Sequence, residues 1–170
     1  GILTGTVRNA NGDAVSTPAI SGLVSRWQGE GNANDAVSTN HGTLMNGAAF
    51  ATGKVGQGFS FDGADDYVII PDSPSLSPTT GITIAAWVKL NAAGGNWQPV
   101  SFKEGPQGRA WWFGFYPGST SRIAWSNGGL SSYDLSCDIP SALNTWRYIV
   151  VTYQSGSGRK IYTDGALICS

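Results

Sequence analysis

The stretch ITIAAWVKL, residues 82–90, decides the fold class, because its apolar side chains recur at every second position. One face of this stretch carries Ile82, Ile84, Ala86, Val88 and Leu90. The other face carries Thr83, Ala85, Trp87 and Lys89. Such alternation is typical of a β-strand with one face against a hydrophobic core. The sequence therefore predicts a strand over residues 82–90.

The same pattern recurs on both sides of this strand. Further strands are predicted over residues 2–7, 23–27, 58–62, 66–70, 99–103, 109–116, 121–126, 133–137, 145–153, 160–163 and 166–169. Turn signals separate them at intervals of about 8–12 residues, which is typical of a sandwich or barrel. No stretch of sufficient length shows the 3.6-residue period of an amphipathic helix. We therefore predict an all-β sandwich.

The composition narrows the function classes. Only 12% of the residues are charged, against about 25% in typical soluble domains, and the abundant Gly and Asn suit an extracellular β protein with many turns. The net charge is −1 and the basic residues are scattered, whereas a nucleic-acid surface needs a basic stripe. No apolar run approaches the roughly 18 residues that span a membrane. We expect a secreted or cell-surface protein whose export signal has been removed, with no nucleic-acid partner and no membrane span.

Four groups of motifs point to a known family. They are GLVSRW (22–27) with EGNAND (30–35); NHGTL (40–44) with NGA (46–48); GKVGQ (53–57), FSFDG (59–63) and DDYV (65–68); and TIAAWV (83–88), echoed by residues 146–153 and by YTDG (162–165). In this order they resemble the bacterial laminin-G-like domains of the concanavalin A-like lectin/glucanase superfamily. The resemblance implies a jelly-roll β-sandwich over residues 21–170 and a bacterial, extracellular recognition module. It says little about the ligand, because this fold carries many functions.

Two features depart from the family pattern. Residues 1–20 do not belong to it; they are interpreted as a short N-terminal β extension and linker, with a turn at Asn9–Asp13. The second departure is that family members continue through further strands after the Asp164–Gly165 hairpin, so we expect a C-terminally incomplete domain. Either the chain is a fragment, or the extra N-terminal strand and the missing strands complement each other. Exchange between subunits would build a filament, and a structural subunit is therefore the alternative function.

Catalysis is not predicted. The glutamates are Glu30 and Glu104, and neither lies in the Glu-x-Asp-x-x-Glu pattern that glycan hydrolysis by this superfamily uses. His41 is the one histidine, in a Gly/Asn-rich loop without nearby partners for acid–base chemistry. We expect a binding module for a carbohydrate or an extracellular protein.

A structural calcium ion is the candidate cofactor, because calcium takes carboxylate, amide and carbonyl oxygens from loops. The predicted ligands are Glu30, Asp35, Asn40 and Asp66, and the resemblance implies that Asp35 is the ligand shared with related domains. The alternative is that these side chains only form Asx turns and shape a hairpin.

Aromatic residues are the candidate sugar-binding groups, because sugars stack their apolar ring faces on exposed aromatic rings. Trp97 lies in the loop GGNWQ (94–98), and Trp111 and Trp112 must point to opposite faces of a strand. The predicted binding set is Trp97, Arg109, Trp112, Tyr116 and Trp125, with Arg122 as an alternative to Arg109. The competing interpretation is that the aromatics fill the core.

The two cysteines, Cys137 and Cys169, leave two possibilities. They could form one disulfide, which export favours, or remain two small buried side chains.

Overall fold

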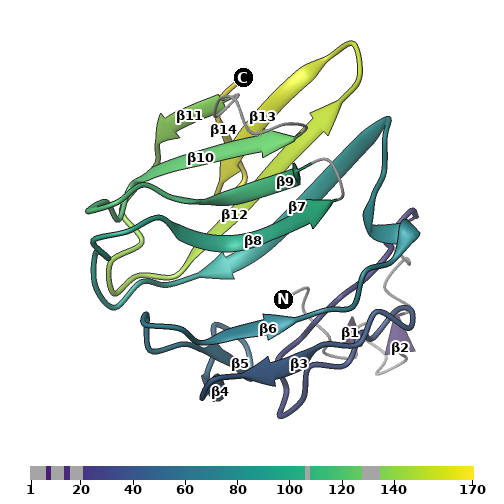
Figure 1. The fold of residues 1–170 in the computed structure, drawn as a ribbon, viewed down its shortest axis with the longest axis vertical. Helices are drawn as coiled ribbons and strands as arrows, with labels where there is room; N and C mark the ends of the chain where they lie inside the picture. Colours follow the sequence, from purple (N-terminus) through teal and green to yellow (C-terminus); the bar gives the residue numbers. More distant parts are fainter. Residues whose placement is uncertain (1–6, 9–13, 16–20, 106–107, 128–134) are drawn as a thin grey trace. The chain divides into compact units, whose positions relative to one another are not determined.

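A computed structural model describes residues 7–8, 14–15, 21–105, 108–127 and 135–170 of the chain (Figure 1). These residues form two compact units, Gly1–Leu76 and Ser77–Ser170. In both units the described secondary structure is antiparallel β-sheet, apart from one short 3-10 helix, η1 (Pro74–Leu76). No helix in the described part of the chain is long and apolar enough to cross a membrane.

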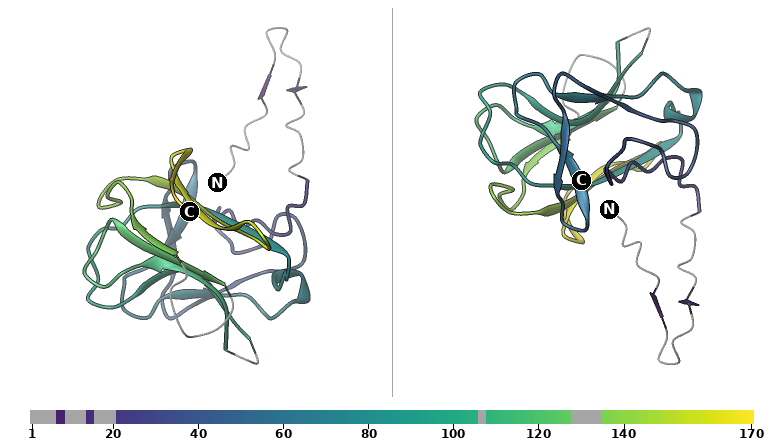
Figure 2. Two further views of the ribbon diagram at one scale, coloured as in Figure 1. Left: turned by 90° about the horizontal axis from the view of Figure 1, so that it is seen from above. Right: turned by 90° about the horizontal axis from the view of Figure 1, so that it is seen from below.

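The second unit contains two four-stranded sheets, one over the other (Figures 1 and 2). The first has the order β11-β10-β9-β8, with β8 (Gln98–Gly105), β9 (Gly108–Phe115), β10 (Arg122–Asn127) and β11 (Leu135–Asp138). The second has the order β14-β13-β12-β7, with β7 (Gly81–Val88), β12 (Arg147–Gln154), β13 (Gly158–Thr163) and β14 (Ala166–Cys169). The predicted all-β sandwich is confirmed.

The core lies between these two sheets, where the inward rows of both meet. Its fully buried large side chains are Phe113, Phe115, Ile123, Trp125, Ile149, Val151 and Ile161. Burying an aliphatic or aromatic side chain of this size stabilises a fold by about 1.5–3 kcal/mol. The indole Nε1 of Trp125 donates a hydrogen bond to the Thr152 carbonyl at 2.9 Å, so its one polar atom is satisfied across the core.

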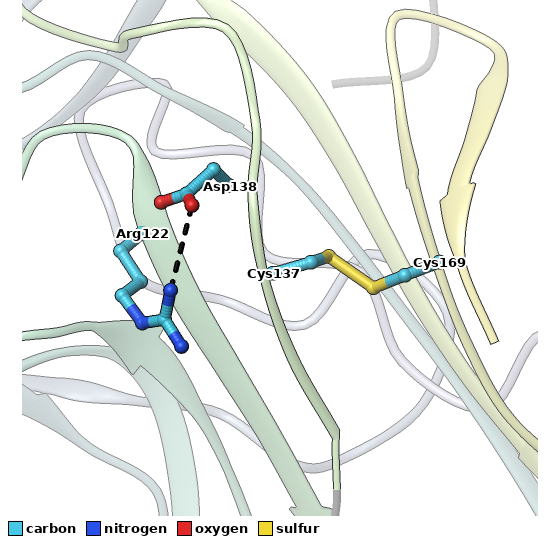
Figure 3. Close-up of a disulfide and its surroundings, with 4 residues drawn as sticks. All are labelled: Arg122, Cys137, Asp138 and Cys169. Carbon is cyan, nitrogen blue, oxygen red and sulfur yellow. Dashed lines mark hydrogen bonds and ion pairs between the residues drawn. A yellow bond between two sulfur atoms is a disulfide. The ribbon is translucent and has the colours of Figure 1, made fainter.

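A disulfide joins the edges of the two sheets. The sulfurs of Cys137 on β11 and Cys169 on β14 are bonded, and both side chains pack against the core (Figure 3). The cysteines are separated by 32 positions in the sequence. Closing a loop of that length restricts the unfolded chain by roughly 3–4 kcal/mol in the chain-entropy model. Of the two possibilities that the sequence left open, the structure contains the bridge.

Gly114 allows β8 and β9 to approach closely where their pairing shifts register, between Pro99 and Ser101. A Cβ at residue 114 would collide with the Gln98 carbonyl oxygen and would lie 2.8 Å from Pro99 Cα. Real Cβ atoms essentially never come that close to backbone. Glycine is therefore required at residue 114 because a side chain would collide with the neighbouring strand. The requirement does not come from the backbone conformation.

The first unit consists of short strand pairs. They are β1 (Val7–Arg8) with β2 (Ala14–Val15), β3 (Thr43–Met45) with β6 (Tyr67–Ile69), and β4 (Ala49–Thr52) with β5 (Gln57–Ser60). The first pair lies within the predicted N-terminal β extension, which stays a prediction, and the predicted turn at Asn9–Asp13 lies outside the described residues. The domain boundary after residue 20 stays a prediction.

The prediction of a strand over residues 23–27 is wrong. Only an isolated bridge between Trp27 and Asp35 forms there. The chain instead turns back, and the Asp35 carboxylate accepts hydrogen bonds from the N–H groups of Arg26 and Val37. These N–H groups are therefore not available for pairing with a neighbouring strand. The strands β3 and β4 were not predicted. They flank the turn at Asn46 and Gly47, both with positive φ, and strands of three and four residues are too short to show an extended alternation.

Candidate functional site

Three aromatic side chains gather beside the first sheet of the second unit, and we call them the aromatic cluster: Trp97, Trp112 and Tyr116. The ring of Trp97 meets Trp112 edge-on, with centroids 5.4 Å apart and an interplanar angle of 89°. It meets Tyr116 at 4.4 Å and 48°. Both distances are typical of favourable aromatic pairs. Trp97 is therefore the ring that joins the cluster.

Strand alternation places two members of the cluster on one face. Phe113 and Phe115 of β9 point into the core, so Trp112 and Gly114, at the alternate positions, lie on the opposite face of the sheet. Tyr116 is the next alternate position and follows directly after the strand. The predicted opposite orientation of adjacent tryptophans is found, since Trp111 packs against the core. Trp112 is 4% exposed, whereas Trp97 and Tyr116 are partly exposed.

Gly114 also makes room for the cluster. A Cβ at this position would lie 2.8 Å from Cη2 of Trp112, so the indole ring lies over the bare glycine backbone. Any larger residue at 114 would lift the ring away from the sheet. The same glycine thus serves strand pairing and the seating of Trp112.

Two loops meet at Trp97. The Gly118 N–H donates to the Gly94 carbonyl at 2.7 Å. Gln98 Nε2 donates to the Ser119 carbonyl at 3.4 Å. The loop that carries Trp97 is therefore tied to the loop that follows Tyr116, which fixes the spacing of the two partly exposed rings.

An ion pair extends the cluster along the sheet. The Arg122 guanidinium carbon lies 5.2 Å from the centre of the Tyr116 ring. Its Nη1 lies 3.4 Å from Asp138 Oδ2, and the two side chains are 47% and 67% exposed (Figure 3). Arg122 and Asp138 are register partners on β10 and β11. Trp112, Trp97, Tyr116, Arg122 and Asp138 thus form one continuous series of contacts, which we call the aromatic–ionic series.

The structure brings together only part of the predicted ligand set. Trp97, Trp112 and Tyr116 lie together, and their role in binding stays a prediction. Trp125 is a correction: it is 0% exposed in the core, so the competing interpretation holds for this residue. The side chain of Arg109 lies outside the described residues. Arg122, the alternative cation, occupies the position beside the cluster.

Asp138 is the residue of this site that the sequence analysis missed. Its only local signal is its place beside Cys137, at the end of a predicted strand. Its partner is set by the register of β10 against β11, which no turn signal in the sequence fixes. The pairing therefore became visible only in the fold.

The predicted calcium ligands make their hydrogen bonds in different parts of the chain. Asp35 is buried, and its carboxylate accepts hydrogen bonds from the N–H groups of Arg26 and Val37, both at 2.9 Å, and from Ser38 Oγ at 2.5 Å. Burial alone raises the pKa of this carboxyl. The bonds from Ser38, from the two backbone N–H groups and from Ser25 outweigh burial and hold the pKa well below its ordinary value. Asp35 therefore organises the loop through its hydrogen bonds.

Asn40 is also engaged within the loop. Its Nδ2 lies 2.7 Å from Ser25 Oγ and 3.1 Å from the hydroxyls of Ser38 and Ser75. The backbone carbonyl oxygen of Asn40 accepts a hydrogen bond from Trp27 Nε1 at 2.7 Å. Glu30 is elsewhere occupied, accepting from the Gln57 N–H at 3.1 Å. The alternative that these residues shape a loop agrees with these contacts.

Asp66 lies in a different group of carboxylates. One oxygen from each of Asp62, Asp65 and Asp66 lies within 4.8 Å of the others, and among the described residues this is the one such group of three or more His, Cys, Asp or Glu. Asp66 Oδ2 accepts the Asp62 N–H at 2.9 Å. Its Oδ1 is buried and has no hydrogen-bond partner in the described part of the chain. Carboxylate oxygens are ligands that calcium takes, so this group is a second candidate position for the ion.

Comparison with known proteins places the fold in a family. A laminin-G-type family model, described as concanavalin A-like lectin/glucanases superfamily, matches residues 62–170. Comparisons with curated proteins and with solved structures found no match.

Proposed function

The chain belongs to the concanavalin A-like lectin/glucanases superfamily, and from that premise we propose that it is a non-catalytic, extracellular recognition module that binds a glycan at the aromatic cluster. The family suggests a binding module in general terms. The choice of a glycan over a protein rests on the chemistry of the aromatic–ionic series.

The observation that carries the proposal is the continuity of aromatic and ionic groups. Trp97 and Tyr116 offer partly exposed rings 4.4 Å apart, and Tyr116 leads directly to the exposed pair of Arg122 and Asp138. Sugars have C–H faces that pack on aromatic rings and hydroxyls that bond to charged groups beside them. A binding site for a sugar needs both kinds of group side by side, and this series supplies them.

Non-catalytic function is supported by the use that the fold makes of the candidate acid–base groups. His41 Nδ1 accepts a hydrogen bond from the Asp35 N–H at 3.1 Å, which is a structural role in the loop. The Glu30 carboxylate accepts a hydrogen bond from the Gln57 N–H, which is also a structural role. An extracellular location is supported by the disulfide, since such bonds persist in oxidising compartments.

Screening the purified protein on a glycan array, as wild type and as Trp97→Ala, tests the proposal. We expect bound glycans whose signal falls at least tenfold in the variant. Leu167→Ala is the matched control, because it removes a 52% exposed apolar side chain from β14 without touching the cluster. Glycan binding that both variants retain would reject the cluster as the site, and a failure to bind any glycan would reject the proposal.

Calcium is a second proposal, at a new position. We propose that the carboxylates of Asp62, Asp65 and Asp66 hold a structural calcium ion. The buried, unpartnered Oδ1 of Asp66 supports it, because an unpaired buried oxygen is unfavourable unless a cation or donor meets it.

The alternative function, a filament subunit that exchanges strands, stays a prediction. Sedimentation velocity over a hundredfold range of concentration distinguishes it from the module. Growth of large species with concentration would favour the filament.

A further inference from the structure

Resting on the proposed glycan site, we infer that this site selects neutral sugars that present two neighbouring hydroxyls to Arg122 and Asp138, and that it discriminates against uronate and sulfated sugars. The inference concerns the class of ligand. It follows from how the ion pair is oriented, how exposed it is and which hydrogen bonds it leaves open.

Arg122 is oriented before any ligand arrives. The Tyr116 ring supports its guanidinium on one side, and Asp138 holds Nη1 on another. Its backbone N–H donates to Ser119 Oγ at 2.7 Å, and its carbonyl accepts the Tyr116 N–H at 3.0 Å. The backbone bonds fix Arg122 on its strand, while the ring and the carboxylate hold its guanidinium, so the side chain loses less conformational freedom when it binds a ligand. The guanidinium is therefore a positioned donor rather than a mobile surface charge.

The pair presents a donor and an acceptor next to each other. Within the described residues, Nη1 to Asp138 is the one hydrogen bond that the guanidinium makes, so its remaining N–H groups are open to a ligand. Asp138 is the more exposed partner, at 67%. An ionised carboxylate only accepts hydrogen bonds, and a guanidinium only donates them. Two neighbouring hydroxyls match this arrangement, because one can accept from Arg122 while the other donates to Asp138.

An acidic sugar matches the pair poorly. A carboxylate or sulfate accepts hydrogen bonds but cannot donate one to Asp138. Its attraction to Arg122 is opposed by repulsion from Asp138, which lies 3.4 Å from the same guanidinium. Unsatisfied acceptors and opposed like charges are the elements by which binding sites reject the wrong ligand. The net charge of the pair is zero, so the pair itself does not attract an acidic glycan at long range.

The aromatic part of the series agrees with a neutral ring. Trp112 is almost fully buried, and its ring contacts the Trp97 ring edge-on. The partly exposed rings of Trp97 and Tyr116 therefore offer the contact surface. Stacking there uses the apolar face of a pyranose and needs no charge. Both halves of the series therefore favour the same class of ligand.

The test compares neutral, uronate-containing and sulfated glycans on one array, followed by titration calorimetry with the best neutral and the best acidic binder. For the wild type we expect the neutral glycan to bind at least tenfold more tightly. Asp138→Asn should weaken the neutral glycan several-fold and narrow the preference. Asp164→Asn is the matched control: it alters the comparable Arg147–Asp164 ion pair, at 3.0 Å, on the other sheet.

Each outcome decides one of the two proposals. A preference for acidic glycans that Trp97→Ala abolishes would overturn the inference and leave the glycan site standing. An unchanged preference in folded Asp138→Asn would also overturn it. If Asp138→Asn does not fold, Arg122→Gln tests the same pair with the opposite shift: it should weaken the neutral glycan several-fold and widen the preference for it, because Asp138 then repels an acidic glycan without a cation beside it. Unchanged affinity for the neutral glycan in Arg122→Gln would overturn the inference. If no glycan binds in a manner that depends on Trp97, the proposed function itself fails.

Discussion

Cys137 and Asp138 are consecutive residues of β11 that serve opposite faces of the sheet. The sulfur of Cys137 is bonded to Cys169 and packs against the core, whereas the carboxylate of Asp138 meets Arg122 on the exposed side (Figure 3). β11 is a short edge strand, paired on one side with β10. The disulfide is therefore the covalent support for the strand that carries the acidic member of the aromatic–ionic series.

Removing the disulfide should lower stability and loosen this strand. For the double variant Cys137→Ala and Cys169→Ala we expect the free energy of unfolding to fall by about 2–5 kcal/mol, because the unfolded chain regains the freedom of the closed loop. Urea unfolding with and without a reductant measures it. The reductant should destabilise the wild type and leave the double variant unchanged. Equal stability of the two proteins under oxidising conditions would contradict this role.

Gly114→Ala should destabilise the sandwich and disturb Trp112. The added methyl collides with the Gln98 carbonyl and crowds the Trp112 ring. Overpacking of this kind typically costs about 1–3 kcal/mol, and tryptophan fluorescence should shift as the ring moves. Gly95→Ala is the matched control, because its added Cβ meets nothing within 4 Å. If Gly114→Ala unfolds at the same urea concentration as the wild type and Gly95→Ala, that result would contradict the close approach of β8 and β9 at Gly114.

The pH dependence of stability should carry a contribution from Asp35. Its pKa in the folded protein lies well below the ordinary value of about 3.9. Its ionised form is therefore favoured by folding, and the stabilisation is fully present well above pH 4 and is lost as the pH falls toward the folded pKa. Asp35→Asn should lower stability at pH 7, and the gap to the wild type should close on acidification. Chemical unfolding at pH 7, 5 and 3 measures it.

Ser38→Ala provides the control for this cause. It removes the side-chain donor at 2.5 Å but keeps the carboxylate, so its stability should lie between those of the wild type and Asp35→Asn at pH 7. A gap between wild type and Asp35→Asn that is constant with pH would contradict the lowered pKa.

The sequence predicted the fold better than the site, for a physical reason. Alternation over residues 82–90 and 145–153 reports burial on one face, which is a local property, and β7 and β12 form there. Loops depend on partners far along the chain: Asn40 meets Ser75, and Arg122 meets Asp138 across a strand pair. Trp125 could not be separated from a surface aromatic, because its alternation fits either face until the second sheet is placed. Asp35 and Asn40 were predicted as ligands of one ion, and in the structure both bind Ser38 within their loop.

Calcium binding should depend on Asp66 and be independent of Asp35. Asp66 combines a buried oxygen that has no partner among the described residues with two neighbouring carboxylates, whereas both oxygens of Asp35 already accept hydrogen bonds within its loop. After treatment with a chelator, added calcium should raise the melting temperature of the wild type, because an ion that binds only the folded state stabilises it. The rise should vanish in Asp66→Asn and persist in Asp35→Asn. Terbium luminescence gives an independent readout. A melting temperature that calcium leaves unchanged in the wild type would reject the site, and a response lost only in Asp35→Asn would return the ion to the originally predicted loop.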